Sequence, residues 1–186
     1  MLLPGDLPSL SELAHSDRMA TTRNIEALIP NLRRYARALC RDRDLADDLV
    51  QDTLERALSR FFLWRRGSNL RAWLFTIMHN LHVNGAATRY APARIAGEDM
   101  VAALTDATLP QSDTQSLRET LRALDLLPDD QRRILLLVAL EGLSYTEIAA
   151  IIGIPIGTVM SRLSRGRETL RRLTDRDAAP PLRRVK

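Results

Sequence analysis

Apolar residues recur every three or four positions along two long stretches of this chain, residues 24–89 and 114–174, and this spacing limits the possible folds more than any other feature. Leu32, Ala36 and Leu39 form one such run. The spacing is that of an α-helix with one buried face, and nowhere does the chain show the alternation typical of a strand. The sequence therefore predicts an all-α fold.

The two stretches predict two small helical domains. In residues 20–89 we expect three helices, over 24–40, 44–59 and 69–88, with Asp44 and Asn69 as N-caps. We expect the third of these helices to be buried through Leu70, Trp73, Leu74, Ile77 and Leu81.

In residues 114–174 a helix is expected over 116–127, and a second, strongly apolar helix begins near Pro128 and stops at Gly142. A pair of shorter helices follows it.

The rest of the chain lacks helical periodicity. Residues 90–113 contain prolines, a glycine and four acids against one Arg, so we expect a flexible linker that lets the two domains move independently. We also expect residues 1–19 to be a mobile N-terminal arm and residues 175–186 to be a disordered tail.

Several function classes are excluded by what the chain lacks. There is no run of about 18 uncharged apolar residues, as a membrane span needs, and no basic start before an apolar run, as in a signal peptide. Cys40 is the single cysteine, which rules out an internal disulfide and a cysteine-based zinc site. We find no phosphate-binding glycine loop and no nucleophile constellation. We expect a cytoplasmic protein that is not an enzyme and needs no cofactor or metal.

Residues 142–173 have the pattern of a helix-turn-helix. Ser144 and Glu147 form a capping box that opens a short helix, and Gly153 ends it. Pro155 then suits the first turn of a second helix with five Arg and one acid between Pro155 and Arg172. Such a helix fits the DNA major groove, where Arg binds guanine edges. An ordinary helical hairpin with a solvated, arginine-rich face is the alternative, and GC-rich codon usage would also favour Arg over Lys.

At this point the sequence resembles the extracytoplasmic-function (ECF) sigma factors of the sigma-70 family. The runs Leu143–Ala149 (LSYTEIA) and Gly157–Arg167 (GTVMSRLSRGR) look like their region 4. Two upstream runs, Ala46–Thr53 (ADDLVQDT) and Ala72–Asn80 (AWLFTIMHN), look like their region 2. The resemblance covers about residues 24–173 and implies a protein that directs RNA polymerase to promoters.

The resemblance implies roles for three sets of residues. Region 4 reads the −35 element, which implicates Thr158, Ser161, Arg162, Ser164, Arg165 and Arg167. Region 2 docks on the polymerase through a helix that here contains Asp48, Leu49, Gln51, Asp52 and Glu55. Capture of a flipped −10 base implicates Trp64, Arg65, Arg66, Asn69 and Asn80.

Two further features of region 2 have consequences. Arg71, Phe75, His79 and His82 share a helix face, and a Phe beside cations indicates an interface; the two His have no local carboxylate or Cys with which to hold a metal. Residues 84–87 (NGAA) stand where the family has an Asp and a basic run, which implies fewer phosphate contacts.

The implied partners are core RNA polymerase, promoter DNA and an anti-sigma factor. The alternative function is an autonomous helix-turn-helix regulator that does not dock on polymerase. In that case the helix over 44–59 and the aromatic loop would have no role.

Overall fold

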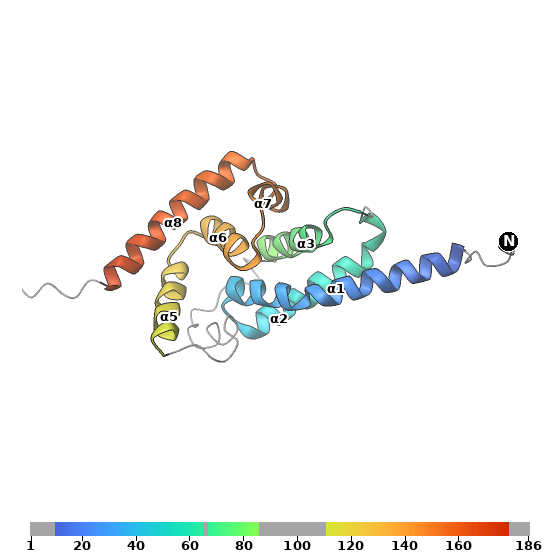
Figure 1. The fold of residues 1–186 in the computed structure, drawn as a ribbon, viewed down its shortest axis with the longest axis horizontal. Coiled ribbons are helices and arrows are strands. Elements are labelled where there is room, and N and C mark those ends of the chain that lie inside the picture. Colours follow the sequence, from blue (N-terminus) through green and yellow to red (C-terminus); the bar gives the residue numbers. More distant parts are fainter. Residues whose placement is uncertain (1–9, 65–66, 86–110, 179–186) are drawn as a thin grey trace, which may run out of the picture.

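The computed structural model describes residues 10–64, 67–85 and 111–178, and in these residues every regular element is a helix (Figure 1). The elements are α1 (Leu10–Cys40), α2 (Arg43–Ser59), a 3-10 turn (Phe61–Leu63), α3 (Leu70–Gly85), α5 (Gln111–Asp125), α6 (Asp129–Glu141), α7 (Tyr145–Ile152) and α8 (Ile156–Ala178). The all-α prediction is confirmed.

Helices α1 and α2 are joined by a tight corner. Arg41 has a φ of 59°, in the left-handed region, and its amide N–H donates to the carbonyl of Arg37. The side chain of Asp42 then accepts a hydrogen bond of 2.9 Å from the amide of Leu45. The N-cap of α2 is therefore Asp42, two residues before the predicted Asp44, which lies in the first turn and suits the positive helix end.

Helix α3 begins as predicted, because the Asn69 side chain accepts from the amide of Ala72 at 3.0 Å. Its buried face differs in part from the prediction. Leu74 is fully buried, but Trp73 and Ile77 are only half-buried, whereas Phe75 and Met78 are completely buried. The reason is that α3 packs against α7 as well as α2, so it has a second covered face.

We call α1 to α3 the first unit and α5 to α8 the second unit. In the second unit, α6 and α7 end at the predicted glycines. Gly142 and Gly153 both adopt left-handed φ angles, of 58° and 74°, at the C-caps of α6 and α7. Between them the capping box of Ser144 and Glu147 is present. Pro128 occupies the N-cap of α6, directly before its first turn.

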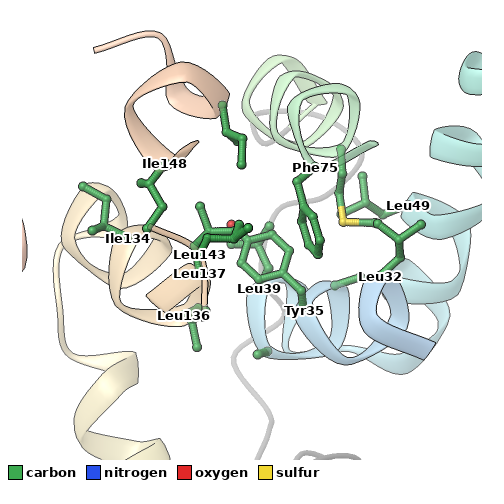
Figure 2. Packing of buried hydrophobic residues seen from close by; sticks show 14 of the residues in the cluster. Leu32, Tyr35, Leu39, Leu49, Phe75, Ile134, Leu136, Leu137, Leu143 and Ile148 are labelled. Carbon is green, nitrogen blue, oxygen red and sulfur yellow. The ribbon is translucent and has the colours of Figure 1, made fainter. Parts of the chain in front are cut away.

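In this structure the two units share one apolar core. Helix α1 contacts α6, and α3 contacts α7. In Figure 2, Leu137 and Leu143 of the second unit lie next to Leu39 and Tyr35 of the first. The Tyr35 and Phe75 rings meet edge to face, with centroids 5.4 Å apart. An apolar face on each unit is covered by the other, which sequence periodicity within either unit does not reveal.

The predicted arm, linker and tail lie largely outside the described residues, which leave out 1–9, 65–66, 86–110 and 179–186. Helices nevertheless occupy part of each predicted segment. Helix α1 begins at Leu10 within the arm, α5 begins at Gln111 within the linker, and α8 continues to Ala178 within the tail. Among the described helices none is by itself both long and apolar enough to cross a membrane; α7 and α8 pass this length and composition test only as a pair bent by 105°.

Candidate DNA and polymerase interfaces

Helix α8 is held by one face and leaves the opposite face open. Val159, Leu163 and Gly166 are buried against the rest of the second unit. Gly166 permits a close crossing with α6, since a Cβ built on it would lie 2.8 Å from Cδ1 of Leu135. The helix-turn-helix predicted from the sequence is therefore formed by α7, Gly153 and α8.

The predicted −35 residues lie on or beside the open face. Ser161, Ser164, Arg165 and Arg167 are exposed, and Thr158 is half-buried. The Arg165 Nε donates to the carbonyl of Ser161 at 3.3 Å, which leaves its terminal nitrogens for another acceptor. Arg162 differs from the others, because it forms an ion pair of 3.0 Å with Asp130 of α6. Arg162 thus also joins α8 to α6.

The predicted polymerase-docking residues fall on two faces of α2. Asp48, Gln51 and Glu55 are exposed, Asp52 is half-buried, and Gln51 donates to Glu55 at 3.0 Å. Leu49 is fully buried in the core. The acidic stripe formed by Asp48, Asp52 and Glu55 is thus accessible. Leu49, on another face of α2, packs in the core.

The residues predicted to capture a −10 base are only partly brought together. The Trp64 ring stacks at a tilt on Phe61, with centroids 5.6 Å apart. Arg65 and Arg66 lie outside the described residues. Asn69 and Asn80 are both exposed, at the start and in the third turn of α3. Sequence reasoning missed Phe62, which is 81% exposed beside this loop.

Asn69 has a second contact, with the helix-turn-helix. Its Nδ2 donates to Oε1 of Glu147 in α7 at 2.6 Å. The pKa of Glu147 is lowered, chiefly by its hydrogen bonds with Ser144. One carboxylate therefore both caps α7 and ties a candidate −10 residue to the second unit.

A buried carboxylate at the end of α6 links the units further. Glu141, whose side chain has no exposed surface, accepts hydrogen bonds from Arg34 (2.9 Å), Arg71 (2.6 Å) and Asn31 (2.9 Å). Both Arg also donate to backbone carbonyls at this helix end, those of Leu140 and Glu141. Two cations from the first unit compensate one anion of the second. We name Asn31, Arg34, Arg71 and Glu141 the Glu141 cluster.

A second polar contact lies at the end of α1. Arg132 of α6 is buried and donates to the carbonyl of Leu39 at 3.0 Å. Arg41 pairs with Asp125 at 2.7 Å. Burial raises the pKa of Asp125, and Arg41 acts in the opposite direction. Neither polar contact was predicted, because the partners are distant in sequence.

The α3 face that suggested an interface does form one, with the second unit. Phe75, His79 and His82 are buried on it, and the Arg71 guanidinium lies 5.9 Å from the Phe75 ring centre. Burial and nearby Arg133 of α6 lower the pKa of both histidines to about 4. The described residues contain no group of three or more His, Cys, Asp or Glu placed to hold a metal ion.

A helix-turn-helix with an exposed, arginine-rich second helix, attached to a helical unit with an acidic outer stripe, defines a DNA-binding protein of the transcription-factor class. Comparison with known families places it more narrowly. The Sigma2 domain of PhyR matches residues 25–79, and Sigma-70 region 4 matches residues 117–170. The ECF RNA polymerase sigma factor EcfG of Rhodopseudomonas palustris is 43% identical over 157 residues, 84% of this chain and 86% of that protein. The chain belongs to the ECF RNA polymerase sigma factors.

Other relatives agree. SigW of Bacillus subtilis, also an ECF RNA polymerase sigma factor, is 31% identical over 68% of this chain and 74% of its own length. Among solved structures, the sigma factor RpoE of Bartonella quintana in complex with the anti-sigma factor NepR is 35% identical and matches with a TM-score of 0.67, covering 84% of this chain and 97% of that one. CnrH in complex with the cytosolic domain of CnrY, at 24% identity and a TM-score of 0.66, shows the same fold.

Proposed function

We propose that this sigma factor docks on core RNA polymerase through the acidic stripe of α2, reads a −35 element with α8 and captures a −10 base near Trp64 and Asn69. The observation that carries the proposal is the separation of charge between two exposed faces. The stripe of Asp48, Asp52 and Glu55 repels DNA and suits a protein partner, whereas α8 has no acid before Glu168. An autonomous regulator would need only α8.

Residue roles follow from exposure. Ser161, Ser164 and Arg165 are the base contacts we propose for α8, with Arg167 beside a phosphate. Arg162 contributes to DNA binding only if its ion pair with Asp130 is exchanged for a phosphate. Leu49 we assign to support of α2 rather than to contact, because it has no exposed surface.

We further propose that an anti-sigma factor, acting in the cytoplasm, controls the chain. Support comes from the arrangement of the two units. The match to RpoE in its complex with NepR covers 84% of this chain, more than either unit alone, so it includes both units. In our structure the units are closed on each other, with Asn69 bound to Glu147. A partner that binds this closed arrangement would keep a −10 residue from DNA.

Docking on polymerase is tested by Asp48→Arg in the full chain. The substitution reverses a charge on the exposed stripe, so we expect core polymerase to bind at least tenfold more weakly, because like charges across an interface cost several kcal/mol. Binding is measured by titrating labelled sigma factor with purified core enzyme. Glu26→Arg is the matched control, since it makes the same charge change on an exposed position of α1.

Circular dichroism should show the same helicity for both variants. Equal affinity of the Asp48→Arg variant and the unaltered chain for core polymerase would remove the docking assignment. A loss shared by Glu26→Arg would mean that the effect is one of overall charge.

A further inference from the structure

The N-terminal half of α8 has two large apolar side chains that the fold does not bury. Ile156 is 44% exposed and Met160 is 51% exposed, although Val159 and Leu163 in the same turns are 0% and 2% exposed. An apolar side chain that stays in contact with water does not contribute hydrophobic stabilisation to the fold. Two of them, one turn apart on one helix, therefore indicate a surface that another molecule covers.

These side chains belong to the same surface as the proposed base contacts. Ile156, Met160 and Ser164 follow one another at intervals of four, so they form one row along the helix. Met160 directly precedes the exposed Ser161. The apolar row is thus an edge of the reading face and continuous with it.

The surroundings of Met160 are open and contain more Arg than acid. Met160 lies in the wall of a depression of about 570 Å³, which is also lined by Tyr145, Ser164, Arg167, Arg171 and the acid Glu168. A Cβ built on neighbouring Gly157 would meet no atom within 4 Å. From Ile156 to Arg167 the helix contains three Arg and no acid. This combination of positive charge and open apolar surface fits the major groove of DNA.

The major groove offers one apolar group that such a row can bind. Thymine presents its C5-methyl group there, and the other three bases present only hydrogen-bonding edges. Methionine is unbranched and flexible, so it can follow a methyl group without a fixed pocket. We propose that Met160, with Ile156 beside it, recognises the C5-methyl of a thymine in the −35 element and so contributes to sequence specificity.

This inference rests on the proposed role of α8, and deoxyuridine tests it because deoxyuridine is thymidine without the methyl group. Holoenzyme made from core polymerase and the full chain first selects binding sequences from a pool of random duplexes. In the selected −35 element, each thymine is then replaced singly by deoxyuridine. We expect one or two of these single replacements each to weaken binding by about fourfold, the loss corresponding to one buried methyl-sized group.

The variants locate the contact. Met160→Ala should bind the thymine duplex as weakly as the unaltered chain binds the deoxyuridine duplex, and it should no longer distinguish the two. Met160→Leu, which restores an apolar side chain of similar size, should recover most of the discrimination. Arg165→Ala serves as a second reference, because it should weaken binding to both duplexes while the discrimination between them persists.

Three outcomes overturn the inference. The unaltered chain is indifferent to deoxyuridine at every −35 thymine, or Met160→Ala weakens both duplexes but still discriminates between them, or Met160→Ala lowers affinity for core polymerase alone. In each case a loss of binding in Arg165→Ala leaves the proposed role of α8 standing. If no −35 element is selected and Arg165→Ala binds normally, the proposed function itself fails.

Discussion

Individual charged residues with little exposed surface mark the contact between the two units. Glu141 and Arg132 are 4% and 2% exposed, and both find their partners in the first unit. A buried charge is tolerated only with such partners, because desolvation of an unpaired ion is costly. Their burial was not predictable from sequence, since Arg34 and Glu141 are 107 positions apart. Nothing near Glu141 in the sequence distinguishes it from the exposed Glu168.

The histidine pair gives the closed arrangement a pH dependence. His79 and His82 have a pKa of about 4 in the folded chain, against an ordinary value of 6.5, because of burial and Arg133. Between these two pH values the unfolded chain binds more protons. The contribution of the two histidines to the free energy of unfolding is therefore fully present above about pH 6.5. It falls as the pH drops towards 4, by at most about 3 kcal/mol per histidine.

Urea unfolding at pH 7.5, 6 and 5 measures this effect. Asp125, whose pKa is raised in the folded chain, partly offsets the loss at the acidic end, because it takes up its proton more readily when folded. His79→Gln combined with His82→Gln should flatten the profile. An equally steep profile in the double variant would show that other groups cause it.

At the scale of helices, local sequence signals were sufficient to predict most helix ends but not which helix faces are buried. The capping box at Ser144 and the glycines at 142 and 153 act within a few residues, and all three occur as predicted. The N-cap of α2 was misplaced because Asp42 and Asp44 are chemically equivalent candidates. For α3 the predicted face was incomplete, because both sides of the helix contain apolar residues and the second partner, α7, begins 60 residues after α3 ends.

The crossing of α6 and α8 depends on Gly166, and larger residues there should weaken it. A Cβ would press on Cδ1 of Leu135, the mobile end of a side chain. Gly166→Ala should therefore change the free energy of unfolding by about 1 kcal/mol or less, since better helix propensity offsets the shift. Gly166→Leu has no such relief and should cost about 1–3 kcal/mol.

Thermal or urea unfolding gives both values. Gly157→Leu, on the open side of α8, is the matched control, and its stability should equal or exceed that of the unaltered chain. A Gly166→Leu variant as stable as this control would mean that α6 and α8 are not closely packed.

Over the whole molecule, the roles proposed for Asn69 and α8 cannot both be carried out on one duplex while the two units are closed on each other. Elements about 25 base pairs apart are separated by about 85 Å of B-form DNA. In the structure a candidate −10 residue, Asn69, is in direct contact with the helix-turn-helix at Glu147. If α8 reads the −35 element and Asn69 contacts the −10 element, as we propose, the units must separate for initiation, and the Glu141 cluster must then exchange its internal hydrogen bonds for water.

A reversible crosslink tests this separation. Asn69→Cys and Glu147→Cys, in a chain with Cys40→Ala, are joined by a short reagent that a reductant cleaves. We expect the joined protein to bind core polymerase but to form no open complex on its promoter, and reduction should restore activity to that of the unjoined variant. The unjoined double-cysteine variant is the control, because both substitutions also remove helix-capping side chains, Asn69 at α3 and Glu147 at α7. Normal initiation by the joined protein would refute the need for opening.

The acidic stripe of α2 stays exposed while the two units are closed, and this has a consequence for competition between sigma factors. If this stripe docks on polymerase, as we propose, a chain locked shut would still present it and would occupy core enzyme without starting transcription. The crosslinked variant should therefore act as a dominant inhibitor that displaces other specificity subunits from a limited pool of polymerase. On the same proposal, a controlling partner would have to cover α2 as well as stabilise closure, because the silenced factor would otherwise lower transcription from every other promoter.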